Sequence, residues 1–113
     1  MKPFKIFATL KKIREFEKLQ LPFVKALIDF DIIIEIGYAQ EKKQAFTPKH
    51  LFLTKVGSVT TIRRRLAKLT EQGIVVRRVN KNDHRSDFLT ISPASLKIME
   101  KYGNVLLSIS VPP

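Results

Sequence analysis

The amino-acid sequence predicts a mainly α-helical fold with one small antiparallel β-hairpin, an α+β arrangement. Three observations predict it: an amphipathic stretch from Ser58 to Gln72, a β-branched run over 74–79, and a turn-rich segment, 80–87, followed by a second β-like run over 88–91. This order, helix then strand, turn and strand, with arginines throughout, is typical of a winged helix-turn-helix. We therefore expect that architecture.

The chain has 113 residues, of which 44% are hydrophobic and 27% charged, as in one globular domain. No linker, repeat or low-complexity segment divides it, so we expect a single domain over residues 1–113. Its parts would be N-terminal helices over 1–44, the helix-turn-helix and wing over 45–91, and a C-terminal helix over 92–113. There is no cysteine, which excludes disulfides and thiolate metal sites.

The first third of the sequence predicts helices. Residues 3 to about 19 place one apolar stripe on a helix: Ile6, Phe7, Leu10, Ile13 and Phe16. Pro22 marks a new start, and residues 23–43 are apolar enough for a buried central helix. The isoleucines 32–34 could form a strand, but the length of the segment favours a helix. Whether Asp29 or Asp31 divides this helix stays open.

Helix start and stop signals organise the remainder. Ala45-Phe46 is a candidate short strand, and Thr47-Pro48 then gives a cap followed by proline at the first helical position. Gly57 is expected to allow a tight turn, and Ser58 to cap the next helix. That helix is expected to stop at Gly73 in a left-handed conformation. Ser92-Pro93 repeats the cap-and-proline signal and begins the last helix.

The helix after Ser58 has a buried and an outward face. Ile62, Leu66 and Leu69 fall within about 60° of one another on a helical wheel, so they form the buried stripe. Thr60, Thr61, Arg64 and Lys68 then face outward, with Arg63 and Arg65 nearer the edges.

Positive charge is concentrated in this part of the chain. The net charge is +11, and residues 55–85 hold nine basic side chains against Glu71 and Asp83. Such excess favours a polyanionic partner. An arginine-rich helix alone is more often a solvated face, whereas its coupling to a turn, a glycine stop and a basic hairpin favours nucleic acid.

We predict a double-stranded DNA interface on this helix and hairpin. Arginine can bind guanine through two hydrogen bonds, and threonine can contact a thymine methyl group or a phosphate, whereas Lys68 is placed for phosphate. A cation at the hairpin tip can enter the minor groove, while Asp83 would brace the wing. The predicted DNA-binding residues are Ser58, Thr60, Thr61, Arg63, Arg64, Arg65, Lys68, Arg78, Lys81, His84 and Arg85.

These residues resemble the MarR family of winged-helix regulators. The matching pattern is Ser58-x-x-Thr61-Ile62-Arg63-Arg64, then Leu66-x-x-Leu69-x-x-x-Gly73-Ile74-Val75-x-Arg77, then Asp83-His84-Arg85. It covers about residues 45–100 and is moderately specific. The resemblance implies a dimeric transcriptional regulator in which Thr61 and Arg64 lie in the major groove, Arg85 at the minor groove, and Asp83 braces the wing.

The chain departs from the family in its shorter C-terminal region. Members normally carry longer terminal helices that form the dimer, and a small-molecule effector often binds between them and the DNA-binding lobe, so the resemblance implies an effector only weakly here. The 4-3-4 spacing in the last helix suits a helical seam. We expect a homodimer, although the same residues could close the monomer's own core; the candidate interface is Ile6, Leu10, Ile98, Tyr102, Val105 and Ile109.

Other functions have less support from the sequence. His50 and His84 lie far apart without ligand-spaced partners or a nucleophile–base set, so we expect no enzyme, metal or cofactor. No signal peptide or apolar membrane span is present, and we expect a cytoplasmic protein without membrane contact. The alternative is a winged-helix module for nonspecific nucleic-acid or protein–protein interaction. Residues 55–85 contain no aromatic platform for single strands, which counts against RNA.

Overall fold

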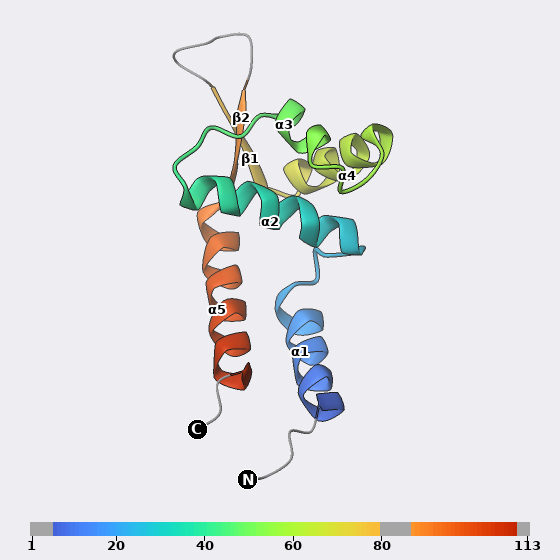
Figure 1. The fold of residues 1–113 in the computed structure, drawn as a ribbon, viewed down its shortest axis with the longest axis vertical. Helices are drawn as coiled ribbons and strands as arrows, with labels where there is room; N and C mark the ends of the chain where they lie inside the picture. The colour runs from blue at the N-terminus through green and yellow to red at the C-terminus, as the bar shows by residue number, and fades with distance from the viewer. Residues whose placement is uncertain (1–5, 80–86, 111–113) are drawn as a thin grey trace. The chain divides into compact units, whose positions relative to one another are not determined.

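The computed structural model describes residues 6–79 and 87–110, within which it contains five helices and one antiparallel hairpin (Figure 1). This confirms the predicted fold class. Contacts divide the chain into two compact units, residues 1–22 with 97–113 and residues 23–96. The single domain over residues 1–113, with its parts over 1–44, 45–91 and 92–113, stays a prediction.

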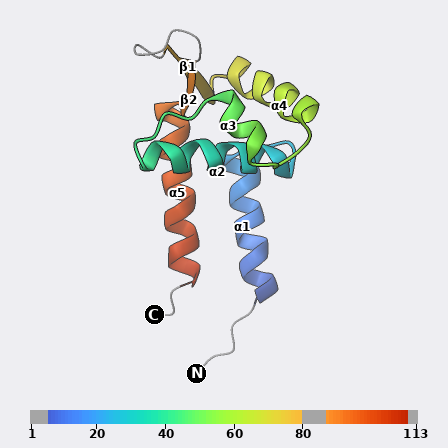
Figure 2. The same ribbon diagram turned by 45° about the horizontal axis from the view of Figure 1, so that its top comes forward.

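The unit of residues 23–96 contains three helices and the hairpin. Its elements are α2 (Leu27–Glu41), α3 (Pro48–Leu53), α4 (Val59–Glu71), β1 (Val75–Arg78) and β2 (Phe88–Ile91), followed by the first turn of α5 (Pro93–Ser110). In both ribbon views α3, α4 and the hairpin lie on the same side of α2 (Figures 1 and 2). The surface opposite α2 is therefore built from α4 and the hairpin.

Helix α2 is continuous through the three isoleucines, as predicted, but begins at Leu27 rather than near residue 23. The cause is Asp29, whose carboxylate accepts hydrogen bonds from the amides of Lys25 (2.8 Å) and Ala26 (3.2 Å). These bonds satisfy amides at the helix start, which would otherwise lack partners. Asp29 therefore begins the helix instead of dividing it.

The predicted caps of α3 and α4 are confirmed. The Thr47 hydroxyl accepts from the His50 amide (3.2 Å), and the His50 Nδ1 accepts from the Thr47 amide (3.1 Å). The Ser58 hydroxyl accepts from the Thr61 amide (3.2 Å). Gly73 ends the α4 region with a φ of 76°, the left-handed conformation that favours glycine.

The turn between α3 and α4 corrects one prediction. The positive φ of this turn belongs to Lys55, at 60°, so Gly57 does not supply the turn through its own backbone freedom. A Cβ at position 57 would lie 2.6 Å from the Cδ1 atom of Ile28, so the end of this flexible side chain would have to shift to make room for it. The turn thus lies close against α2, and the space for a side chain is already filled.

The hairpin is short and in regular antiparallel register. Val75 pairs with Ile91, and Arg78 pairs with Phe88. The predicted strand at Ala45-Phe46 is wrong: these residues are not assigned to a strand, although the Leu89 amide donates to the Phe46 carbonyl (2.7 Å).

The core of this unit draws on every element. Side chains at most 3% exposed come from α2, α3, α4 and both strands: Ile32, Ile33, Ile36, Leu51, Ile62, Leu66, Leu69, Val75, Leu89 and Ile91. Burying such a side chain stabilises the fold by about 1.5–3 kcal/mol relative to leaving it exposed. Apolar burial therefore holds α4 on α2.

The other unit contains α1 (Ile6–Gln20) and most of α5. The predicted caps hold for α5, because the Ser92 hydroxyl accepts from the Ser95 amide (3.2 Å). The rings of Phe16 and Tyr102 stack with centroids 5.6 Å apart, and the Tyr102 hydroxyl donates to Glu17 (2.7 Å). Several large apolar side chains of this unit remain exposed: Phe7 (82%), Leu19 (78%), Leu107 (62%) and Leu10 (46%).

Candidate nucleic-acid interface

Helix α4 presents the two faces that its sequence predicts. Ile62, Leu66 and Leu69 are buried, at 0–2% exposure. Thr60, Arg64 and Lys68 are exposed on the outward side. Because the buried stripe fixes which way the helix faces, these three side chains lie where an external ligand can reach them.

The N-terminus of α4 holds two of the predicted contact residues in one small network. Besides capping the Thr61 amide, the Ser58 hydroxyl donates to the Thr61 hydroxyl oxygen (2.9 Å). The hydroxyl hydrogen of Thr61 is therefore the one directed to other acceptors, such as phosphate or base oxygens. Ser58 caps α4, and the Thr61 hydroxyl lies directly beside it.

Two neighbouring arginines have different surroundings. The Arg63 guanidinium lies 5.3 Å from the ring centroid of Phe52, a cation–π contact that ties it to α3. Arg64 is exposed on the outward face. Arg63 is thus oriented by the protein, whereas Arg64 extends toward any groove that α4 enters.

Arg65, the third arginine, is bound inside the protein. Its Nε lies 2.7 Å from Asp29 Oδ1 and its Nη2 lies 2.8 Å from Asp29 Oδ2. The Arg65 side chain is 17% exposed and the Asp29 side chain 0%. The sequence places Arg65 among the DNA contacts, but the structure gives its guanidinium to Asp29. We therefore separate it from the exposed set.

The electrostatics of this pair favour both charged forms. Burial raises the pKa of the Asp29 carboxyl, but the hydrogen bonds from Arg65, Lys25 and Ala26 and the charge of Arg65 outweigh it, so the pKa is lowered. The hydrogen bond to Asp29 raises the pKa of Arg65. The sequence analysis missed Asp29 as a partner of α4. Its only signal was a carboxylate near the start of an apolar helix.

The hairpin adds further basic side chains. Arg77 and Arg78 are exposed on β1, and Arg78 Nε donates to the Thr90 hydroxyl (3.4 Å). The predicted wing-tip contacts Lys81, His84 and Arg85, and the bracing Asp83, lie outside the described residues.

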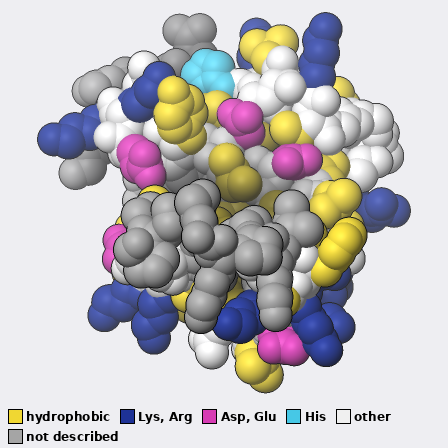
Figure 3. Space-filling model, turned by 60° about the horizontal axis from the view of Figure 1, so that its bottom comes forward, with side chains coloured by type: hydrophobic (Ala, Val, Ile, Leu, Met, Phe, Trp, Pro, Cys, Tyr) yellow, Lys and Arg dark blue, Asp and Glu magenta, His cyan; other side chains and the backbone are white. Residues whose placement is uncertain are grey.

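Basic residues are not confined to α4 and the hairpin. On the face shown in Figure 3, Lys and Arg side chains stand around the edge, with acidic and hydrophobic side chains between them. Charge alone therefore does not define the interface. Its definition rests on the combination of the exposed α4 face with the adjoining basic strand.

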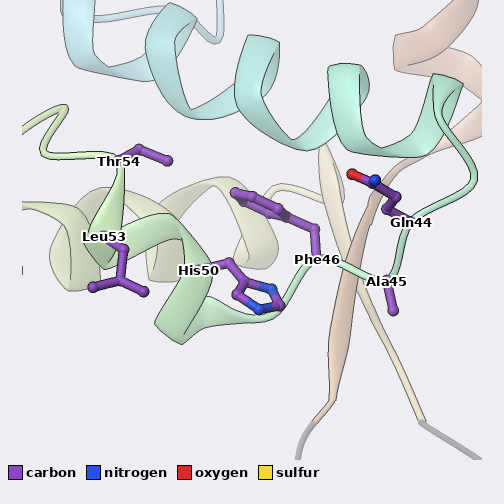
Figure 4. Close-up of a pocket in the computed structure, with 6 residues that line it drawn as sticks. All are labelled: Gln44, Ala45, Phe46, His50, Leu53 and Thr54. Atoms are coloured by element: carbon purple, nitrogen blue, oxygen red, sulfur yellow. The ribbon is translucent and has the colours of Figure 1, made fainter.

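One shallow pocket of about 490 Å³ lies beside α3, lined by Gln44, Ala45, Phe46, His50, Leu53 and Thr54 (Figure 4). The rings of Phe46 and His50 lie 5.7 Å apart in it. The His50 Nδ1 already accepts the Thr47 amide, so this nitrogen is not available as a base. Nowhere in residues 6–79 and 87–110 do three His, Cys, Asp or Glu side chains form a candidate metal site. The pocket supports no catalytic assignment.

The candidate dimer residues differ in how exposed their side chains are. Leu10 is exposed, and Ile98 and Val105 are half-buried. Tyr102 is engaged within its own unit by Phe16 and Glu17. The side chains of Ile6 and Ile109 are not among those described.

Of the helices that the structure describes, none has the length and apolar character to span a bilayer.

Comparison with known proteins relates the fold to solved winged-helix structures. No protein-family model and no curated protein matches the sequence. The MepR–DNA complex from S. aureus is 14% identical, with a TM-score of 0.72 over 94% of this chain and 76% of that one. A mutant of MarR from E. coli in complex with operator DNA is 19% identical, with a TM-score of 0.57 over 93% and 76%. Wild-type apo MarR from E. coli is 18% identical, with a TM-score of 0.58 over 97% and 84%. The chain therefore has the winged-helix fold of the MepR and MarR structures, which confirms the resemblance at the level of the fold.

Proposed function

We propose that this protein is a sequence-specific, double-stranded DNA-binding transcriptional regulator. The observation that carries the proposal is the exposed face of α4, where Thr60, Arg64 and Lys68 stand opposite a fully buried stripe. The fold supports it, since MepR and MarR structures with this architecture include DNA complexes. In this proposal α4 enters the major groove, the wing lies at the minor groove, and the protein acts in the cytoplasm without enzymatic activity.

The side chains have separate roles. Arg64 reads guanine and Thr60 and Thr61 contact thymine methyl groups or phosphates, because they lie on the outward, N-terminal part of the helix. Lys68, Arg63 and Arg78 bind phosphates and set position rather than sequence. Lys81, His84 and Arg85 contact the DNA from the wing tip, with Asp83 as its brace.

We further propose a homodimer. The exposed apolar side chains of α1 and α5 support this, because a monomer gains nothing by leaving Phe7 82% exposed and Leu107 62% exposed. A dimer with two-fold symmetry would bind two half-sites about one DNA turn apart. A small-molecule effector is the least supported part of the proposal.

Selection of duplexes from a random pool, followed by titration of the winner across salt concentrations, tests the proposal. An enriched palindrome whose log affinity falls steeply with log salt is the expected result. Steep salt dependence without any enriched sequence would contradict sequence-specific regulation. It would instead favour a module for nonspecific nucleic-acid or protein–protein interaction.

A further inference from the structure

The ion pair between α2 and α4 is the most directional contact of the recognition helix. The Asp29 carboxylate accepts four hydrogen bonds: two from Arg65, at 2.7 and 2.8 Å, and one each from the Lys25 and Ala26 amides, at 2.8 and 3.2 Å. With its side chain 0% exposed, Asp29 has no surface that could touch DNA. Its effect on DNA must therefore pass through Arg65.

The buried stripe of α4 sets which face of the helix points outward, but base recognition depends on a finer adjustment of its orientation. Ile62, Leu66 and Leu69 hold the helix on the core, but apolar contacts are non-directional. Base recognition through two hydrogen bonds requires positions held within about 0.5 Å and 10–20°. A guanidinium that lies about 10 Å from the helix axis would move by about 2 Å if α4 rotated by about 10°. That displacement exceeds the tolerance of about 0.5 Å.

A two-point ion pair supplies the missing direction. The planar guanidinium of Arg65 meets both carboxylate oxygens, which fixes distance and plane together. Arg65 directly follows Arg64 in the chain, so holding one guanidinium sets the backbone from which the next extends. Asp29 is itself held by the two amides at the start of α2, so it provides a firm anchor.

We propose that Asp29, acting through Arg65, is a positioning residue that determines how well α4 discriminates between DNA sequences. The proposal rests on the proposed function and adds a residue that no DNA contact would reveal. The pair raises the ratio of cognate to random affinity while adding little to the affinity for random DNA, because the charge of Arg65 is neutralised by Asp29.

The test measures affinity for the selected duplex and for a random duplex, each across salt concentrations, in the full chain. The variants are Asp29→Asn, Arg65→Met and the double variant Asp29→Leu with Arg65→Met, with thermal unfolding measured in parallel. Asp31→Asn, an exposed carboxylate on the same helix, is the matched control. The double variant matters because apolar replacement of a buried ion pair often preserves or raises stability.

We expect the double variant, which keeps the net charge of the pair at zero, to lower the ratio of cognate to random affinity about tenfold, with the random affinity and the salt slope unchanged. Asp29→Asn leaves the charge of Arg65 unpaired and Arg65→Met leaves the charge of Asp29 unpaired, so both should lower the ratio while shifting the random affinity in opposite directions. The Asp31→Asn control should keep the wild-type ratio. A merely structural role would instead lower the unfolding temperature and both affinities alike.

Three outcomes would overturn the proposal. A folded double variant that keeps the wild-type ratio would show that the pair does not position α4. A salt slope reduced by about one in the folded double variant, in which no charge is left unpaired, would make Arg65 a phosphate contact. A double variant that does not fold would show that the pair holds the fold itself. A wild-type protein without any sequence preference would instead refute the proposed function, and this proposal with it.

Discussion

The two compact units differ in how completely each one buries its apolar residues. Both units expose some large apolar side chains, Leu27 (79%) and Leu53 (68%) in residues 23–96 and Phe7 (82%) in α1, but residues 23–96 also bury an apolar core at most 5% exposed, whereas among the described residues of the other unit only Leu21 (2%) is a buried apolar residue. The first pattern is that of a unit that completes its own core. The second unit has little apolar core of its own, and its exposed side chains form the surface on which the proposed dimer rests. We therefore expect substitutions in the core of residues 23–96 to lower stability, and substitutions on the exposed surface of α1 and α5 to change partner binding.

The largest expected effect comes from opening the core of residues 23–96. Leu66→Ala should lower the free energy of unfolding by about 2–5 kcal/mol, since it removes buried methyl groups and leaves a cavity. Chemical denaturation of both proteins would measure it. Leu53→Ala, at a 68% exposed position outside the proposed dimer surface, is the matched control and should change stability by no more than about 0.5 kcal/mol. Equal losses at both positions would break the comparison.

The next effect concerns where DNA is read. Arg64→Ala should cost about 1–3 kcal/mol on the selected duplex and relax its base preference, because a two-point contact with guanine is lost. Lys68→Ala should instead weaken all duplexes alike and reduce the salt slope. Equal losses for Arg64→Ala on selected and random duplexes would remove Arg64 from base reading.

A smaller effect is expected at the exposed surface of the terminal helices. Phe7→Asp should raise the dimer dissociation constant at least tenfold, or about 1.4 kcal/mol, because a carboxylate would be buried against apolar groups. Sedimentation at micromolar concentration would measure it. A protein that is monomeric before the substitution, or a dimer unaffected by it, would mean that Phe7 lies outside any interface.

A further effect, confined to high pH, is a pH dependence within the terminal unit. Burial, with the hydrogen bond and charge of Glu17, raises the pKa of Tyr102 from 10.0 to about 12. The folded state therefore favours the neutral phenol, so this contribution is fully present below pH 10 and is lost as pH rises toward about 12. Tyr102→Phe should flatten the decline in unfolding temperature between these values. An unchanged decline would mean that Tyr102 ionises alike in both states.

Local signals accounted for most of the fold. The cap-and-proline pairs at Thr47 and Ser92 and the stop at Gly73 gave helix ends, and a 3.6-residue period identified Ile62, Leu66 and Leu69 as buried. These features depend on neighbours within one or two turns. A single sequence carries that information directly.

Features that depend on distant residues were not predictable. Asp29 and Arg65 are 36 residues apart, and their pairing depends on how α2 and α4 pack. The close approach of Gly57 to Ile28 likewise depends on how the turn packs against another helix. The three consecutive arginines look equivalent in the sequence. In the structure Arg63 lies over the Phe52 ring, Arg64 is exposed to solvent and Arg65 is bound to the Asp29 carboxylate.

Gly73, between α4 and β1, adopts a left-handed backbone conformation with a φ of 76°. A Cβ at this position would meet nothing within 4 Å, so any L-residue here would be opposed by its φ of 76° alone and not by a neighbour. That opposition amounts to about 1–2 kcal/mol for most side chains and less for asparagine. The turn between α4 and β1 therefore has space for a side chain, but its backbone conformation favours glycine over any L-residue. Libraries that vary the hairpin should therefore keep glycine at position 73, because an L side chain there is opposed by the backbone conformation.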